Sequence, residues 1–367
     1  MSTGDDRPAR GGPAAERAAG GGRAGAGVGP RRGLVLGGGG MLGAAWTVGA
    51  LCAVEEATGW RPGSAEIVLG TSAGALLGAL LAAGVQPGEL RDHQLGRPVT
   101  TGPLVGVEFD YDTVVGGALP PRPQAGIGSP GLLRDAVRHP RDYPFLTMVS
   151  AAVPPGRGSV APIGDLVRGL LGDGDWPAGS GLRVAAVDYR SGQRVAFGDP
   201  EAPVAAVAEA VMASCAIPGW FAPVEVAGGR YVDGGCWSAT NADLMAGRGL
   251  DEVYVLAPMG VRLHPAGRAE PGRGTVAALR EWRARDRPRG VLAQLLSRYR
   301  RAVTRQLLRE VRQLRAVGTR VQLLAPTQAD LAVMGPNMMD PARRGPVLES
   351  ALRTSRAALT ALAAPAG

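Results

Sequence analysis

A serine between two glycines is the first residue of the chain with an evident capacity for chemistry. Ser72 follows three apolar residues (67–69) that predict a short buried strand, and an apolar run with helical spacing comes after it. Gly70 and Gly74 flank the serine in a G-x-S-x-G pattern, which between strand and helix is typical of a nucleophile elbow. Glycine leaves room in so tight a turn, and the helix N-terminus favours negative charge at the serine oxygen. Ser72 is therefore a candidate nucleophile, and a glycine-rich turn with a structural serine is the alternative.

A run of glycines upstream could supply the hydrogen-bond donors that such a nucleophile needs. Residues 33–36 predict a short strand, four consecutive glycines follow, and a helical pattern begins near Gly43. The run contains G-x-G-x-x-G, but a dinucleotide site also needs an acidic residue at the end of the second strand, and here that strand ends in the serine. We therefore expect the backbone N–H groups of Gly38, Gly39 and Gly40 to act as oxyanion donors, with a nucleotide site as the alternative.

The serine also needs a base, and Asp233 is one candidate. It ends an apolar strand and is followed by Gly234 and Gly235, which let the backbone turn closely. A carboxylate in this position can approach Ser72 directly and act as a general base.

A histidine is the other candidate base. His264 follows Ser72 and Asp233 in the chain order Ser, Asp, His that α/β-hydrolases use, but it lies in a segment rich in Gly, Pro and Arg rather than after a strand. His93 and His139 fall near the ends of predicted helices, where a solvated surface position is expected. The residues alone leave both bases open.

The surrounding sequence predicts a sheet that positions these residues. Further strands are expected at 182–188, 193–197, 223–226, 230–232, 251–256 and 320–324, and helices at 131–138, 163–171 and 204–214. Strands that alternate with helices indicate an α/β fold with a mainly parallel central sheet and helices on both faces. The segment 96–163, rich in Pro and Gly, is expected to be a loop-rich cover over the mouth of the site.

Composition predicts the domain organisation. The chain has 367 residues, of which 45% are hydrophobic and 4% aromatic, so it can form a sizeable core built from Leu, Val and Ala. Residues 1–32 carry almost no large apolar side chain and predict a disordered arm. We expect one domain over 33–350, with a basic helical insert at 262–318, and a C-terminal helix or tail at 351–367.

Several classes of protein are excluded by the same composition. No run of 18 apolar residues and no N-terminal apolar segment are present, so neither a transmembrane helix nor a signal peptide is expected. We therefore expect a cytoplasmic location. The 3 cysteines are scattered and only 3 histidines occur, which argues against a disulfide framework and a metal site. No cofactor is expected.

The basic insert carries most of the local positive charge. Between 273 and 320 there are fourteen arginines and three acidic residues, and the apolar residues from 292 to 314 keep helical spacing. A solvated surface helix is one interpretation, and peripheral contact of helix 290–317 with an anionic membrane is the other. The net charge of +8 comes from arginine alone in a Gly-, Ala- and Pro-rich chain, which suggests coding bias, so no nucleic-acid partner is expected.

Taken together, four segments resemble the patatin-like phospholipase family: Leu-Gly-Gly-Gly-Gly (36–40), Gly-Thr-Ser-Ala-Gly (70–74), Ala-Ser-Cys-Ala-Ile-Pro (213–218) and Val-Asp-Gly-Gly (232–235). The resemblance covers residues 33–241 in order and spacing. It implies a patatin-like αβα sandwich and a metal-free serine lipid acyl hydrolase of the phospholipase, lysophospholipase or esterase kind. It also implies a Ser72–Asp233 dyad rather than a triad, and an oxyanion hole in the glycine loop. The substrate would be a lipid or another acyl ester.

One position departs from the family pattern. The family commonly has Arg or Lys just before the last glycine of the loop, and this chain has Leu42 before Gly43. The change removes a charge that could meet a phosphate, so the sequence does not predict which head group the substrate carries. Ester hydrolysis remains expected. A Ser-His-Asp esterase using His264, a transacylase using the same dyad, and a membrane-binding protein with a silent site are the alternatives.

Overall fold

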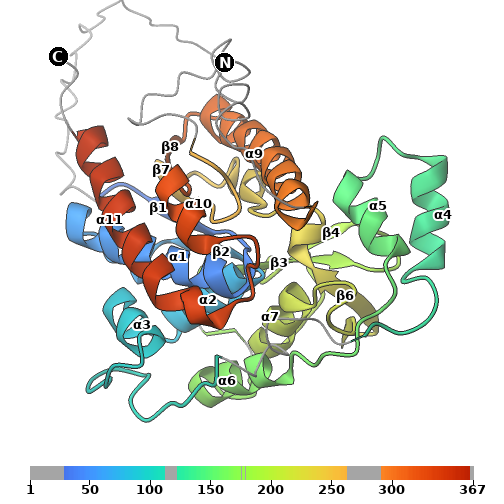
Figure 1. The fold of residues 1–367 in the computed structure, drawn as a ribbon, viewed down its shortest axis with the longest axis horizontal. Coiled ribbons are helices and arrows are strands. Elements are labelled where there is room, and N and C mark those ends of the chain that lie inside the picture. The colour runs from blue at the N-terminus through green and yellow to red at the C-terminus, as the bar shows by residue number, and fades with distance from the viewer. Residues whose placement is uncertain (1–28, 112–121, 175, 178, 263–290, 364–367) are drawn as a thin grey trace, which may run out of the picture. The chain divides into compact units, whose positions relative to one another are not determined.

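The computed structural model describes residues 29–111, 122–174, 176–177, 179–262 and 291–363 (Figure 1). The described residues from Arg31 onward form one compact unit. The predicted arm 1–32 lies almost wholly outside the described residues, so its disorder stays a prediction.

One eight-stranded sheet organises this unit. Its strands are β1 (Arg32–Leu36), β2 (Ile67–Thr71), β3 (Leu182–Asp188), β4 (Arg194–Phe197), β5 (Val224–Val226), β6 (Gly229–Asp233), β7 (Glu252–Leu256) and β8 (Arg320–Leu324). The order is β5-β6-β3-β2-β1-β7-β8, with β4 paired to β3. Five neighbouring strands are parallel to one another, namely β3, β2, β1, β7 and β8. The pairs β3–β4, β3–β6 and β5–β6 are antiparallel. The expectation of a mainly parallel α/β sheet is confirmed.

Helices cover both faces of the sheet (Figure 1). They are α1 (Gly40–Thr58), α2 (Ala73–Ala82), α3 (Pro87–Gln94), α4 (Pro130–Arg138), α5 (Phe145–Ala152), α6 (Ala161–Leu171), α7 (Val207–Cys215), α9 (Val291–Ala316), α10 (Gln328–Met334) and α11 (Arg344–Ala363). Short 3-10 turns are η1 (Pro62–Ser64), η2 (Gly234–Cys236), η3 (Ala242–Met245) and η4 (Pro341–Arg343). No described helix is both long and apolar enough to cross a bilayer.

The alternation of side chains along each strand divides the core into two layers. Leu34 and Leu36 of β1 point into the larger layer, which contains α1, α2, α7 and α11. Val35 between them points the other way, into a smaller layer with Leu307 and Val311 of α9. Strand β1 is therefore apolar on both faces, which explains why a short unbroken apolar run predicted it.

The segment 96–163 holds more helix than its composition predicts. Besides α4 and α6 it contains α5, which a hydrogen bond ties to the turn after β6: the Thr147 hydroxyl donates to the Cys236 carbonyl at 2.8 Å. At the other end of the chain, α11 runs across residue 350, where the sequence predicted a boundary. It packs along α1, where Gly49 allows the backbone of Leu348 to come close.

Candidate active site

The glycine loop and the serine turn leave adjacent parallel strands. β1 and β2 pair so that Leu36 lies beside Gly70, and both strands end at the same edge of the sheet. A Cβ atom on Gly38 would stand 3.0 Å from the Cβ atom of Ser72. The carboxyl ends of neighbouring parallel strands are where open α/β sheets bind ligands, and here the two predicted segments meet.

Ser72 has the strained backbone of a nucleophile elbow. Its φ and ψ are 54° and −125°, a conformation that a non-glycine residue rarely adopts. The turn is too tight for side chains at its flanks: a Cβ atom on Gly70 would lie 2.4 Å from the Cα atom of Ala75, and one on Gly74 would lie 2.0 Å from the Leu36 carbonyl oxygen. These approaches supply the physical reason for the G-x-S-x-G spacing in this chain.

A second serine holds the strained turn. The Ser72 N–H donates to the Ser214 hydroxyl oxygen at 2.8 Å, and that hydroxyl donates to the Ala185 carbonyl at 2.6 Å. Ser214 is fully buried at the end of α7. Ser214 has no role of its own among the sequence-based predictions, although it lies in one of the four segments (213–218) that carry the family resemblance.

The antiparallel strand β6 delivers Asp233 to the same place. It pairs with β3 so that Asp233 lies opposite Ala186, one residue from the position that pairs with Thr71 of β2. The chain then turns tightly at Gly234, where a Cβ atom would stand 2.3 Å from the Ala185 carbonyl oxygen. Because β6 stops level with the end of β2, Asp233 and Ser72 face each other at the same edge.

Burial sets the charge state of Asp233. It raises the Asp233 pKa from its ordinary value of 3.8 to about 6, and the Ser72 hydroxyl and the Gly235 N–H lower the pKa in turn because they stabilise the carboxylate. The Gly235 N–H donates to Oδ1 at 2.7 Å. Asp233 is thus a buried carboxylate that is ionised at neutral pH and yet binds a proton more readily than an exposed aspartate.

The Asp233 pKa predicts a pH profile. We expect kcat/KM for an uncharged ester to rise with pH and to level off above about 6, because only the ionised carboxylate accepts a proton. Below that value kcat/KM should fall about tenfold per pH unit, which a stopped or continuous ester assay between pH 4.5 and 8 would measure. His264→Ala should leave this profile in place, and disappearance of the inflection in that variant would assign it to the histidine.

The three glycines of the predicted oxyanion hole differ in their hydrogen bonds. The Gly38 N–H donates to the Ala239 carbonyl at 2.8 Å and is therefore engaged. Within the described residues, the N–H groups of Gly39 and Gly40 have no hydrogen-bond acceptor. Gly40 has a φ of 61°, and a Cβ atom there would meet the Met339 sulfur at 2.6 Å. Gly39 and Gly40 thus have N–H groups available to an oxyanion, and the oxyanion role of Gly38, Gly39 and Gly40 stays a prediction.

Comparison with known proteins shows the family of the chain. The sequence model of the patatin-like phospholipase family matches residues 34–100 and 118–246, more than half of the chain. The chain belongs to the patatin-like phospholipase family. The family acts on lipid substrates, which places the chain among lipid acyl hydrolases in general. A search of curated proteins found no match. Among solved structures, VipD from Legionella pneumophila is similar at 17% identity and a TM-score of 0.33, over 78% of this chain and 67% of VipD.

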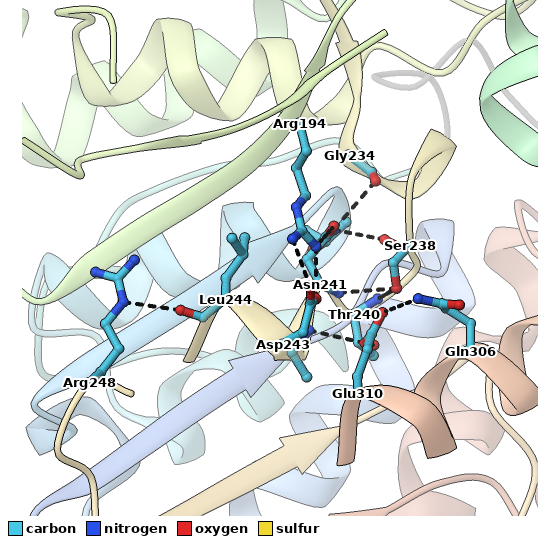
Figure 2. A network of polar contacts seen from close by, with 12 residues as sticks. Arg194, Gly234, Ser238, Thr240, Asn241, Asp243, Leu244, Arg248, Gln306 and Glu310 are labelled. Carbon is cyan, nitrogen blue, oxygen red and sulfur yellow. Dashed lines mark hydrogen bonds and ion pairs between the residues drawn. The ribbon is translucent and has the colours of Figure 1, made fainter. Parts of the chain in front are cut away.

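A single asparagine joins the serine turn of this patatin-like chain to the turn after Asp233. Asn241 has a left-handed backbone with a φ of 52°, and its side-chain amide donates to Thr71 Oγ1 at 3.1 Å, to the Gly234 carbonyl at 3.3 Å and to the Ser238 carbonyl at 2.7 Å (Figure 2). Arg194 donates to its side-chain oxygen at 3.2 Å. Asn241 therefore fixes the residue before Ser72 against the residue after Asp233.

Two of the three histidines of this patatin-like chain, His93 and His139, lie within the described residues. Both ring nitrogens of His93 are occupied, one by the Tyr111 hydroxyl at 2.8 Å and one by the Val107 carbonyl at 2.9 Å, so His93 is half-buried rather than solvated. His139 is exposed, as expected. His264 lies outside the described residues. Within the part of the chain that the structure describes, no cluster of three His, Cys, Asp or Glu side chains could hold a metal ion.

The position that departs from the family pattern faces the core. The Leu42 side chain is fully buried in the larger apolar layer, and its N–H donates to the Met338 carbonyl at 2.9 Å. Gly43 follows it and donates to the Gly39 carbonyl at 3.0 Å, which closes the first turn of α1. In this chain residue 42 therefore contributes to packing, and the absence of a basic residue there gives little information about the head group.

Proposed function

We propose that the chain is a serine lipid acyl hydrolase in which Ser72 is the nucleophile and Asp233 the general base. The observation that carries the proposal is the pairing of a strained, buried serine with a buried carboxylate whose charged form the serine hydroxyl stabilises. A hydroxyl is a weak nucleophile at neutral pH and needs a base within reach. Asp233 has the position and the raised pKa for that task.

Acylation begins when Asp233 takes the proton of the Ser72 hydroxyl. The serine oxygen attacks the acyl carbonyl carbon, and the carbonyl π electrons move to oxygen and form a tetrahedral oxyanion. The free N–H groups of Gly39 and Gly40 hold this oxyanion, and one such donor contributes about 100- to 1000-fold in rate. When the intermediate collapses, the bond to the leaving alcohol breaks, and the alcohol oxygen takes the proton from Asp233.

Deacylation repeats these steps with water. Asp233 takes a proton from a water molecule whose oxygen attacks the acyl-serine carbonyl, again through an oxyanion at the glycine loop. The carbon–oxygen bond to Ser72 breaks, the serine recovers its proton from Asp233, and the fatty acid leaves. Another acyl acceptor in place of water would make the same site a transacylase, so the acceptor must be identified from products.

The experiment that tests this function combines a covalent probe with product analysis. A fluorophosphonate should label Ser72, located by peptide mass spectrometry, and the protein should release free fatty acid from a mixed lipid extract. Profiling the products identifies the head group and separates hydrolysis from acyl transfer. An unlabelled protein that releases no fatty acid from any lipid would support a silent site instead.

We further propose that α9 contacts anionic membrane. Five arginines of this helix are exposed, namely Arg298, Arg305, Arg309, Arg312 and Arg315. The opposite side of the helix is anchored in the sheet by Leu307 and Val311. A helix with one apolar face fixed in the protein and a cationic face outside can bind anionic lipid through charge.

This proposal predicts lipid-selective binding. The protein should co-sediment with vesicles that contain anionic lipid more strongly than with neutral vesicles, and Arg305→Glu combined with Arg312→Glu should reduce that binding. Each reversal removes attraction of about 1 kcal/mol near an anionic surface. The matched control is Arg61→Glu with Arg190→Glu, which changes the net charge equally at two other exposed positions. Equal loss in both double variants would assign the binding to net charge rather than to α9.

A further inference from the structure

Helix α9 sends one carboxylate into the protein toward the catalytic segments. Glu310 is fully buried, although it lies outside the region that the family model matches. It accepts hydrogen bonds from the Thr240 hydroxyl at 2.6 Å, from the Ala242 N–H at 3.1 Å and from the Gln306 side chain at 3.1 Å (Figure 2). Two of these three donors belong to the segment that follows Asp233.

A buried carboxylate is costly, and attachment of the helix does not require this one. Moving a charge out of water carries a penalty of several kcal/mol even after relaxation, which hydrogen bonds offset only in part. Burial raises the pKa of the Glu310 carboxyl, because it disfavours the charged form. Leu307, Val311 and Leu314 already fix α9 on the sheet. The position of Glu310 is therefore better explained by the segment it holds than by the helix that carries it.

That segment, residues 238–242, touches all three parts of the site. Its Ala239 carbonyl accepts the N–H of Gly38 in the glycine loop at 2.8 Å. Its Asn241 amide donates to Thr71, next to Ser72, and to the carbonyl of Gly234, next to Asp233. A shift of segment 238–242 would therefore displace the oxyanion loop, the nucleophile and the base relative to one another.

We propose that Glu310 is a positioning residue, which holds segment 238–242 and thereby sets the relative placement of the glycine loop, Ser72 and Asp233. The inference rests on the proposed function for its kinetic consequences. It adds that a helix beyond the family region takes part in building the catalytic geometry. Glu310 acts through Thr240 and Ala242, and it is not itself in contact with substrate in this scheme.

The test compares Glu310→Ala, Glu310→Gln and Glu252→Ala. Glu310→Ala should lower kcat about 10- to 100-fold with little change in KM, since a misplacement of 1 Å can cost on the order of 100-fold. Labelling of Ser72 by a fluorophosphonate should slow by a similar factor. Glu310→Gln should recover most of both rates, because its amide oxygen can still accept from Thr240 and Ala242.

Glu252→Ala is the matched control for loss of a buried glutamate. Glu252 begins β7 at the opposite edge of the sheet, where it bonds Arg32 at 3.0 Å and Gln322 at 3.2 Å. This variant should lose thermal stability but keep kcat. Equal losses of kcat in Glu252→Ala and Glu310→Ala, or an unchanged kcat in Glu310→Ala, would overturn the proposal.

Hydrogen exchange gives a readout that does not depend on catalysis. Amides of residues 37–43 and 234–245 should exchange faster in Glu310→Ala and at the normal rate in Glu252→Ala. A wild-type protein without esterase activity would overturn the proposed function, whereas unchanged exchange at the glycine loop in Glu310→Ala would overturn the role of Glu310. The two failures are therefore distinguishable.

Discussion

Asp233→Asn is expected to lose activity and gain stability at the same time. Without a base, kcat for a p-nitrophenyl ester should fall by about 100- to 10,000-fold. The raised Asp233 pKa means that the folded state binds more protons than the unfolded state between pH 4 and 6, so the ionised carboxylate lowers the free energy of unfolding as pH rises through this range. A rise from 3.8 to about 6 corresponds to about 3 kcal/mol. Above pH 6 the free energy of unfolding of Asp233→Asn should therefore exceed that of the wild type by up to this amount, as measured in a urea titration.

Ser72→Ala tests the loss of activity without removing the buried charge of Asp233. It should remove activity as completely as Asp233→Asn, and the double variant should be no less active than Ser72→Ala alone, because a nucleophile and its base act as one unit. His264→Ala should retain activity. If Asp233→Asn kept its activity while His264→Ala lost it, the base would be the histidine and the dyad would be wrong.

Gly74→Ala should disrupt the packing of α2 against β1 and thereby the site. The added methyl group would stand 2.0 Å from the Leu36 carbonyl oxygen, so α2 would have to move away from the strand that carries the glycine loop. We expect a loss of about 3 kcal/mol or more in the free energy of unfolding, together with most of the activity, because the elbow and the oxyanion donors separate. Chemical denaturation and an ester assay on the same preparation measure both.

The matched control for that variant is another helical glycine. Gly169 of α6 is exposed, and a Cβ atom there would meet nothing within 4 Å. Gly169→Ala should therefore stabilise the protein by about 0.5–1 kcal/mol, the usual preference for alanine inside a helix, and leave the esterase rate unchanged. A stable and active Gly74→Ala protein would contradict this prediction, because it would show that the elbow accommodates a methyl group 2.0 Å from the Leu36 carbonyl oxygen.

The sequence predicted the parts of the site that local rules govern. Strand, tight turn and helix are encoded within a few residues of Ser72, and the close contacts of Gly70 and Gly74 are the reason that glycine stands there. The mainly parallel sheet followed from the alternation of strand and helix patterns. The roles of Ser72 and Asp233 stay proposals that the experiments above decide.

What escaped prediction depends on partners far away in the chain. The engagement of the Gly38 N–H requires the carbonyl of Ala239, and no local pattern links these residues. Ser214 holds the Ser72 turn across 142 positions, and Glu310 reaches Thr240 across 70. Their residue types are unremarkable in their own segments. Only the fold brings them together, so neither the family segment that contains Ser214 nor the helical spacing around Glu310 indicates which residues these side chains contact.

The place of β1 in the sheet has a consequence for the order in which the protein is made. β1 lies between β2 and β7, and its Arg32 side chain contacts Glu252, which is 220 positions later. Until the ribosome has delivered β7, one edge of β1 is unpaired, and the Leu256 carbonyl that accepts the Gly37 N–H is missing. At about 5–20 residues per second this interval lasts on the order of tens of seconds. A nascent chain therefore carries Ser72 and Asp233 before its glycine loop is fixed, and the loop can take its final place beside Ser72 only after β7 has been made.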